Sequence, residues 1–372
     1  MESSGVKWVR LGDYIEQFRQ KCANNKAIVS GVDINKRFIP TRANLGGTDI
    51  SGYYLVPPTF FACNLMHIGR DERIPIAYND TDKDLVVTSA YYVFHIKQDK
   101  CDEILNEYLY IIFSNKEIDR LTWFYTDSSI RGNLKENRFL DIKMPLPSVA
   151  EQQKVVNTWR AFREIKEQNE AKAAPLMQLC QSYIQELKHK YPMQEIGPYI
   201  HRIDERNTDN KIKEVRSVSV SKNFNATNAK VDKNNLSNYK IVRENQISFV
   251  QTTGNEKCLC AAINHLGFPI VVTSVNEVFE TDEKYLLADY LHLIFRRTET
   301  DRYARFNSWG SARETFTWED MTRFAIPLPS IEVQQAIVNI YKCANEAKQI
   351  AEEADRLSRE VCPALLQHVI HS

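Results

Sequence analysis

The sequence predicts a mixed α+β protein made of two copies of one unit, in which a globular lobe is followed by a long helix. The run Met144–Ser148 (Met-Pro-Leu-Pro-Ser) recurs 182 residues later as Ile326–Ser330 (Ile-Pro-Leu-Pro-Ser). Shifting the chain by 182 residues matches 18 of 50 positions between Tyr108–Asn157 and Tyr290–Asn339 without a gap. A stretch of about 40 residues without glycine follows each run, as a long helix requires. A duplication on this scale predicts a molecule with pseudo-two-fold symmetry.

The repeat divides the chain into four segments. Residues 1–147 and 191–329 are the predicted lobes, and residues 148–190 and 330–372 are the predicted long helices. The prolines of each Pro-Leu-Pro-Ser run can end a strand, and its serine can cap the helix that follows. Apolar residues at three–four spacing, many of them alanine, favour close packing of the two helices. Pro175 and Pro363 are expected to kink the helices or to break their last turns.

Within both lobes, short apolar runs are separated by turn signals. Strands are predicted over residues 27–32, 53–56, 74–78, 85–87 and 91–96 in the first lobe, and over 215–220, 246–250, 260–263 and 270–272 in the second. Helices are predicted over residues 103–115 and 285–297. Strands and helices do not alternate regularly, so a doubly wound parallel sheet is not expected.

Composition is that of a water-soluble globular protein, with 43% hydrophobic and 26% charged residues. No apolar run approaches the roughly 20 residues of a membrane span, and the N-terminal residues lack the apolar core of a signal peptide. A cytoplasmic location without membrane contact is therefore expected. The eight cysteines do not recur between the copies, which argues against a duplicated disulfide framework or zinc site.

Positive charge is concentrated locally although the net charge is zero, with 48 basic and 48 acidic residues. A basic window over residues 19–42 holds six basic residues against one acidic residue, and a second over residues 206–243 holds nine against three. The two windows occupy the same place in each copy. One such run is commonly a solvated face, but its recurrence favours contact with phosphate groups.

The order of lobe, Pro-Leu-Pro-Ser run, Gln-Gln pair and long helix, present twice, resembles the DNA-specificity subunit of Type I restriction–modification systems. The resemblance covers essentially the whole chain. A Ser-x-Arg element shortly before each Pro-Leu-Pro run supports it, with Arg131 in the first copy and Arg313 in the second. The second copy departs from the pattern at Val333, where the family frequently has glutamate, as the first copy has at Glu151.

The resemblance implies that each lobe is a target recognition domain that reads one half of a bipartite double-stranded DNA sequence. The two long helices would pair antiparallel, set the gap between the half-sites and dock two methyltransferase subunits. Restriction subunits with nuclease and translocase activity could join the complex. This chain would hold no cofactor and no metal, whereas its partners would use S-adenosylmethionine, and ATP with Mg for restriction.

Two other classes of function were weighed. An enzyme is disfavoured because Val56–Phe60 lacks the polar residue of an amino-methyltransferase Pro-Pro motif, no phosphate-binding glycine loop is present, and the histidines do not recur between the copies. No catalytic residue is therefore expected. A structural adaptor that binds only proteins explains the duplication and the helices equally well, but leaves the paired basic windows unexplained.

Candidate DNA-binding residues come from the basic windows and from two glycine-containing turns. The best candidates for phosphate contact are Lys36, Arg37, Arg42, Lys222 and Arg243. Arg131 and Arg313 could also touch phosphate, or could pair with a carboxylate such as Asp119 or Asp301. The residues beside Gly69 and Gly254 could form base-reading loops or ordinary exposed turns; they are His67 and Arg70 in the first copy and Asn255 and Lys257 in the second.

Candidate partner-binding residues begin the two long helices. Gln152 and Gln153 in the first copy match Gln334 and Gln335 in the second. These side chains could contact a methyltransferase subunit, or could instead brace the lobes.

Overall fold

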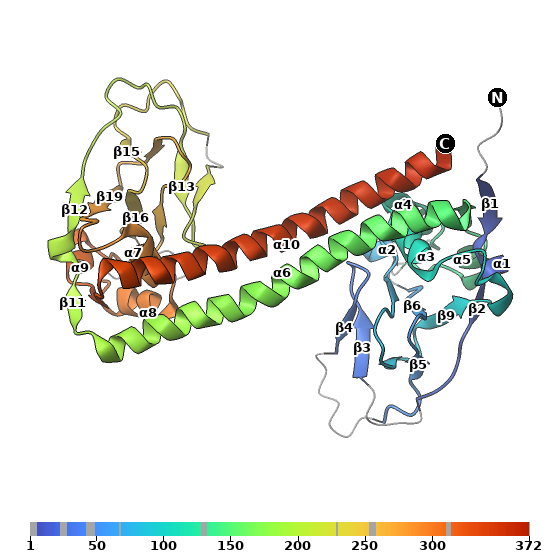
Figure 1. The fold of residues 1–372 in the computed structure, drawn as a ribbon. Helices are drawn as coiled ribbons and strands as arrows, with labels where there is room; N and C mark the ends of the chain where they lie inside the picture. The colour runs from blue at the N-terminus through green and yellow to red at the C-terminus, as the bar shows by residue number, and fades with distance from the viewer. Residues whose placement is uncertain are drawn as a thin grey trace. The chain divides into compact units, whose positions relative to one another are not determined.

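The computed structural model describes residues 6–22, 28–41, 49–66, 68–127, 132–227, 230–252, 258–309 and 314–371. The chain forms two compact units, each of mixed α/β structure (Figure 1). Unit 1 comprises Met1–Gln168 with Ile350–Ser372, and unit 2 comprises Asn169–Gln349. The units do not coincide with the four predicted segments, because each unit takes in one lobe and a part of both long helices.

The described residues of unit 1 form ten short strands and six helices outside the long helices. Strands β1 (Lys7–Arg10) and β10 (Lys143–Leu146) pair antiparallel. One antiparallel sheet has the order β2 (Ile15–Gln17), β9 (Tyr92–Ile96), β6 (Phe61–Cys63), β7 (Ile76–Tyr78). A second has the order β4 (Phe38–Pro40), β3 (Ile28–Val32), β8 (Leu85–Val87), β5 (Tyr54–Val56), in which only β3 and β8 run parallel. The helices are α1 (Leu11–Tyr14), α2 (Ile68–Asp71), the 3₁₀ helix η1 (Gln98–Lys100), α3 (Asn106–Phe113), α4 (Lys116–Phe124) and α5 (Glu136–Leu140).

Unit 2 repeats this plan. Strands β11 (Met193–Glu195) and β20 (Ala325–Pro327) correspond to β1 and β10. The antiparallel sheet β12 (Ile200–Ile203), β19 (Asn276–Thr281), β16 (Ile247–Val250), β17 (Ala261–Ile263) corresponds to the first sheet of unit 1. Two antiparallel pairs complete the strands, namely β13 (Arg216–Val218) with β14 (Phe224–Ala226) and β15 (Lys240–Val242) with β18 (Ile270–Val272). The helices are η2 (Gly197–Tyr199), α7 (Ala288–Phe295), α8 (Thr298–Phe306) and α9 (Trp318–Thr322).

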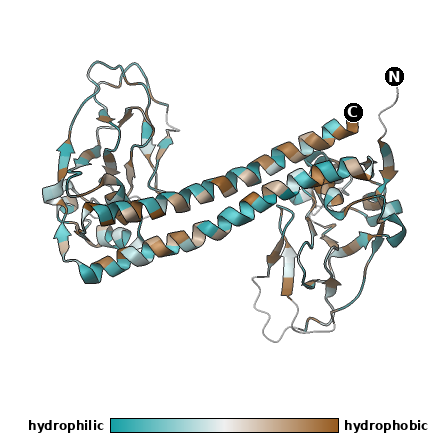
Figure 2. Cartoon of the chain, viewed as in Figure 1, coloured by the Kyte–Doolittle hydropathy of each residue, from teal (hydrophilic) through white to brown (hydrophobic). Residues whose placement is uncertain are grey.

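Both long helices contribute to the core of each unit. Helix α6 spans Val149–Lys190 and α10 spans Ile331–His371. In unit 1, Val155 and Val156 near the start of α6 share one hydrophobic cluster with Leu366 and Val369 near the end of α10. In unit 2 the end of α6 shares a cluster with the start of α10. The helices therefore pack antiparallel in each unit, and Figure 2 shows apolar residues recurring along both of them between polar ones.

The prolines do not end the long helices. Helix α6 continues through Pro175 to Lys190, and α10 continues through Pro363 to His371. A proline in a helix frees the carbonyl four residues earlier, here that of Ala171 or Arg359. Both of these residues are exposed, so water can satisfy the freed carbonyl and the helix persists. The predicted break of the last turns was wrong.

A buried tyrosine forms a hydrogen bond with each Pro-Leu-Pro run. The Tyr108 hydroxyl of α3 donates to the Pro145 carbonyl at 3.2 Å, and the Tyr290 hydroxyl of α7 donates to the Pro327 carbonyl at 2.9 Å. Burial raises the pKa of both phenols, so both remain neutral donors. The strand that precedes each long helix is thereby tied to the lobe interior.

A buried glutamine completes each junction between lobe and helix. Gln152 of α6 accepts from the Leu105 amide at 3.0 Å and donates to the carbonyls of Glu103 at 2.8 Å and Pro147 at 3.0 Å. Gln334 of α10 makes the same three bonds in unit 2, with the Leu287 amide at 2.9 Å, the Tyr285 carbonyl at 2.8 Å and the Pro329 carbonyl at 2.9 Å. Both glutamines are fully buried. One side chain thus satisfies the backbone at the start of a lobe helix and at the end of the Pro-Leu-Pro-Ser run.

The Gln152→Ala substitution is expected to lower the free energy of unfolding of unit 1 by about 2–4 kcal/mol, because it leaves one amide and two carbonyls of the buried or half-buried junction without this partner. Gln153→Ala is the matched control and should cost less than about 0.5 kcal/mol, since the Gln153 side chain bonds only Asn157 on the same helix. Urea denaturation of both variants measures the difference. Equal effects would contradict the role of the buried glutamine.

Candidate nucleic-acid interface

A lysine in a left-handed backbone conformation ends the tight turn of a hairpin in each unit. Lys36 ends the turn between β3 and β4 and has φ 64°. Lys222 ends the turn between β13 and β14 and has φ 62°. The turns close alike, with the Lys36 amide on the Asp33 carbonyl at 3.1 Å and the Lys222 amide on the Ser219 carbonyl at 2.9 Å. Positive φ is disfavoured for a lysine, so other contacts must stabilise both turns.

Those contacts are buried ion pairs. The Lys36 ammonium lies 2.6 Å from the Asp119 carboxylate of α4, and the Lys222 ammonium lies 2.7 Å from the Asp301 carboxylate of α8. Each ammonium also donates to a backbone carbonyl, that of Ile74 or Phe295. Lys36 and Lys222 are only 6% and 5% exposed. Burial lowers the pKa of Lys36 although Asp119 opposes that shift.

The predicted phosphate contacts of Lys36 and Lys222 do not fit this placement. Both ammonium groups point into the units, where a phosphate on the surface would not reach them. Asp119 and Asp301 also accept backbone amides, from Ile74 at 3.1 Å and Leu259 at 3.0 Å. These carboxylates, which the sequence offered as partners for Arg131 and Arg313, therefore serve the lysines. The basic windows recur partly because each fold uses an internal lysine at this turn.

The two predicted recognition segments of unit 1 meet at a pair of glycines. The Gly69 amide donates to the Gly132 carbonyl at 3.2 Å, and the Leu134 amide donates to the Leu65 carbonyl at 2.8 Å. Gly132 has φ +59°, and a Cβ atom there would lie 2.3 Å from the Gly69 Cα. Only glycine fits at this position. The turn that carries Arg70 is therefore held against the segment that follows Arg131.

Unit 2 has a corresponding pair of segments. The Phe316 amide donates to the Gln251 carbonyl at 2.8 Å, and Thr252 bridges Thr315. Thr315 also bridges Trp309, which begins the approach to the second Ser-x-Arg element. The segments flanking Lys257 and Arg313 are thus brought together as in unit 1. Sequence reasoning identified the members of each pair but not their proximity.

The described arginines of the predicted set all pair with carboxylates. Arg70 forms a bidentate pair with Asp71 at 2.7 and 2.8 Å, and that hydrogen bonding raises the pKa of Arg70. Arg243 pairs with Glu205 at 2.8 and 2.5 Å. Arg37 pairs with Asp355 of α10 at 2.5 Å, within unit 1. A phosphate would have to compete with these carboxylates for the guanidinium groups.

Four predicted DNA-binding residues lie outside the described residues, as do two of the residues beside the glycines. They are Arg42, Arg131, Lys257 and Arg313, with His67 and Asn255.

Of the four predicted partner-binding glutamines, two are inaccessible. The side chains of Gln152 and Gln334 are buried and bond the backbone at the junctions between lobe and helix. They are therefore not available for the predicted contact with a partner, and they fit the alternative prediction that they brace the lobes. Gln153 and Gln335 lie on the outer side of their helices and bond Asn157 at 2.8 Å and Asn339 at 2.9 Å. Partner contact by these two stays a prediction.

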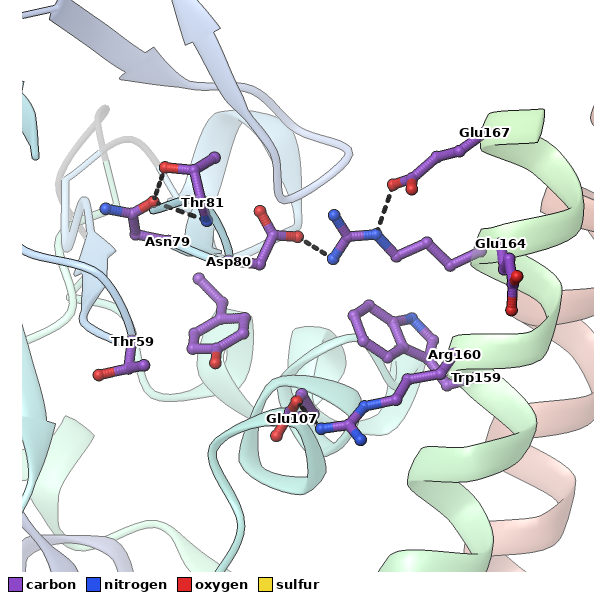
Figure 3. Close-up of a pocket in the computed structure, with 11 residues that line it drawn as sticks. Thr59, Asn79, Asp80, Thr81, Glu107, Trp159, Arg160, Glu164 and Glu167 are labelled. Carbon is purple, nitrogen blue, oxygen red and sulfur yellow. Dashed lines mark hydrogen bonds and ion pairs between the residues drawn. The ribbon is translucent and has the colours of Figure 1, made fainter. Parts of the chain in front are cut away.

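An open pocket of about 360 Å³ lies between the lobe of unit 1 and α6 (Figure 3). Most of its charged side chains pair with one another. Arg160 pairs with Glu107, while Arg163 pairs with Asp80 and with Glu167 and lies over the Trp159 ring. These pairs hold the lobe of unit 1 on the helix.

In unit 2 an ion pair joins the lobe to a long helix at the same repeat positions as the Arg160–Glu107 pair of unit 1. Asp289, the counterpart of Glu107, bonds Lys342 of α10 at 2.7 Å and His265 at 2.6 Å. These partners lower the pKa of Asp289 to about 2 although its burial acts in the opposite direction. Each lobe is thus held by a buried glutamine and by a surface ion pair.

Within the described part of the chain, no three metal-ligating side chains cluster as a metal site would require. No described helix is both long and apolar enough to cross a membrane.

The fold is shared with solved structures at low sequence identity. The S subunit of a Type I restriction–modification system from M. genitalium aligns with a TM-score of 0.65 and 11% identity, over 99% of this chain and 97% of that chain. The HsdS subunit from Thermoanaerobacter tengcongensis aligns with a TM-score of 0.41 and 14% identity, over 99% and 97%. A structure concerning assembly and conformational transition of the type I R-M system aligns with a TM-score of 0.46 and 13% identity, over 99% and 98%. No protein-family model matches this chain, and no curated protein sequence does.

The first of these alignments confirms the predicted fold over nearly the whole chain. The two alignments with lower scores add nothing to that conclusion.

Lys36→Met should lower the free energy of unfolding of unit 1 by about 3–5 kcal/mol, because it leaves the buried Asp119 carboxylate without its cation. The same substitution should leave the salt dependence of any DNA binding unchanged. Arg70→Ala should do the reverse, with less than about 0.5 kcal/mol of destabilisation and a log–log salt slope smaller by about one. Denaturation and DNA titrations at several salt concentrations measure both quantities. A smaller salt slope for Lys36→Met without destabilisation would restore the phosphate prediction.

Unit 2 should lose stability in mild acid through His292, which occupies the repeat position of Tyr110. Each of these side chains bonds the carbonyl of the turn lysine, at 3.1 Å for His292 and 3.0 Å for Tyr110. Burial lowers the pKa of His292 from 6.5 to about 4, so the unfolded chain binds a proton between those pH values and the folded unit does not. Stability is therefore full above pH 6.5 and falls by up to about 3 kcal/mol as the pH approaches 4.

His292→Gln keeps a donor for the carbonyl and cannot titrate, so it should remove this part of the acid sensitivity of unit 2. Thermal unfolding at pH 7.5, 6 and 5 compares the variant with the natural chain. Parallel curves would contradict the assignment.

Proposed function

We propose that this chain is the DNA-specificity subunit of a Type I restriction–modification complex and has no catalytic role of its own. The observation that carries the proposal is the pair of lobes fixed to two shared antiparallel helices by identical junctions. The fold shared with the M. genitalium S subunit over nearly the whole chain supports it.

Each lobe is proposed to read one half of a bipartite DNA target. The paired segments around Gly69 and Gly132 in unit 1, and their counterparts in unit 2, are the best candidates for base contact, because each pair joins two loops that carry predicted DNA-binding residues on a rigid scaffold. Apart from the Ser-x-Arg element that both copies share, their sequences differ, whereas the junction glutamines and tyrosines are identical. Two lobes that read different half-sites need different recognition segments, and they need the same junctions to attach to the two long helices.

The helices are proposed to set the gap between the half-sites and to dock two methyltransferase subunits. Helices of 42 and 41 residues extend about 60 Å at 1.5 Å per residue. Half-sites one DNA turn apart are separated by about 34–36 Å, which helices of this length can span. S-adenosylmethionine would bind the methyltransferase subunits, and ATP with Mg would bind restriction subunits if the system has them. Because such complexes act on intracellular DNA, we place the chain in the cytoplasm.

An adaptor that binds only proteins is the second candidate. The ion pairs of Arg37, Arg70 and Arg243 favour it, since these cations already have carboxylate partners. Among the described residues, these arginines therefore support DNA binding less strongly than the two basic windows of the sequence did.

A methylome separates the two candidates. Cells that express this chain with its neighbouring methyltransferase should carry a new adenine mark at a split motif with a fixed gap, and cells without this chain should not. An active methyltransferase that gives no new mark would contradict the specificity role. A steep dependence of DNA affinity on salt would then indicate a degenerate subunit, and its absence would indicate the adaptor.

Exchanging the lobe of residues 1–147 for that of a relative should alter one half of the methylated motif and leave the other half and the gap unchanged. The expectation rests on the junction, because Gln152 remains in place at the start of α6 to bond the backbone of the new lobe. The methylome of cells with the exchanged chain measures this outcome. A change in both halves would show that the lobes do not read independently.

A further inference from the structure

Each unit ends a lobe helix on a phenylalanine that protrudes into solvent. Phe124 ends α4 and Phe306 ends α8, at the same position of the repeat. Their exposed fractions are 77% and 87%. Two residues earlier, Thr122 and Ala304 are buried against the lobes, about 200° away around each helix. The two phenylalanines therefore point away from the core of their own unit.

Arginines lie beside both phenylalanines. Arg120 and Arg302 match in the repeat, are exposed, and lie about one turn before the phenylalanine, on the same side of the helix. Arg120 pairs with Glu117 at 2.9 Å, while among the described residues no carboxylate pairs with Arg302 or with the neighbouring Arg305. We call Arg120, Trp123 and Phe124 the Phe124 surface, and Arg302, Arg305 and Phe306 the Phe306 surface.

Both surfaces are rigidly supported. The helix that carries each one is fixed to a hairpin by a buried ion pair, Lys36 with Asp119 or Lys222 with Asp301. Each helix also leads into the paired segments described above, since Thr126 bridges Leu134 and Trp309 bridges Thr315. An exposed aromatic group with arginine neighbours on a fixed helix is typical of an interface hot spot.

The two surfaces match at the phenylalanine and at one arginine, although Trp123 of the first aligns with Arg305 of the second, and the two matches indicate what the surfaces face. Residues that read different half-sites are expected to differ between the lobes, as the candidate recognition segments do. A phenylalanine gains free energy only when apolar surface covers it, and the phosphate backbone common to both half-sites offers none. Insertion between bases would depend on the local sequence, which differs between half-sites. A protein present in two identical copies meets both conditions.

We propose that the Phe124 surface and the Phe306 surface are equivalent docking sites for two copies of one methyltransferase subunit. This inference rests on the proposed function and adds a lobe contact to the one assigned to the long helices. Each copy would cover one phenylalanine with an apolar socket, and acidic groups at the socket edge would complement the arginines. Every lobe would then place a methyltransferase beside the half-site that it reads.

Sedimentation of the full chain with the methyltransferase subunit, without DNA, tests the proposal. The natural chain should bind two copies. Phe124→Ala and Phe306→Ala should each weaken one of the two association steps by about tenfold or more and leave the other unchanged, and the double substitution should weaken both. Val275→Ala is the matched control, because this apolar side chain is 69% exposed and lies outside both surfaces.

Two outcomes would overturn the inference while leaving the proposed function intact. One is unchanged association of the doubly substituted chain. The other is unchanged association with weaker DNA binding by the assembled complex, which would assign the surfaces to DNA. A natural chain that binds no methyltransferase and gives no methylation mark would instead contradict the proposed function and this inference with it. Unaltered thermal unfolding of the variants would establish that each still folds.

Discussion

The structure depends on one buried contact made twice, in which a glutamine at the start of a long helix satisfies the backbone of its lobe. Gln152 and Gln334 each bond one amide and two carbonyls, and these groups come from the lobe and from the Pro-Leu-Pro-Ser run. A buried polar group is costly unless it is fully bonded, so this geometry tolerates little change. Surface ion pairs, such as Lys342 with Asp289, add support where water weakens them. A lobe can therefore vary its surface while its attachment to the helix stays constant.

The two units share most of their buried contacts and differ mainly in their surface residues. Both units anchor a strained hairpin turn through a buried lysine–aspartate pair, and the same turn carbonyl accepts from Tyr110 in unit 1 and from His292 in unit 2. That single exchange is expected to make the second unit the more sensitive to acid, because burial lowers the pKa of His292. On the surface, Phe124 and Phe306 are identical, as are the neighbouring Arg120 and Arg302. Their identity is the reason for assigning them to a partner common to both lobes.

The sequence was sufficient for the architecture and insufficient for the site. Repeated motifs and helical periodicity located both long helices, and the apolar runs located strands such as β5, β8, β9 and β18. Strands β4 (Phe-Ile-Pro) and β14 (Phe-Asn-Ala) were missed because a proline or an asparagine interrupts the apolar run that identified β5, β8 and β18. Lys36 and Lys222 were misjudged because charge alone does not reveal whether a side chain points inward. Both lysines have positive φ at the end of a hairpin turn, and a periodic sequence pattern does not reveal that conformation. The contact of Gly69 with Gly132 joins distant segments, so only the fold could show it.

Lengthening both long helices tests the central claim, that fixed junctions make the helices the element that spaces two independent readers. Four residues would be inserted after Gln168 in α6 and after Gln349 in α10, where the two compact units divide. The helices would grow by about 6 Å, or about two base pairs at 3.4 Å each. The methylated motif should keep both half-sites and gain a gap longer by about that number. A changed half-site, or an unchanged gap in an active complex, would contradict the account.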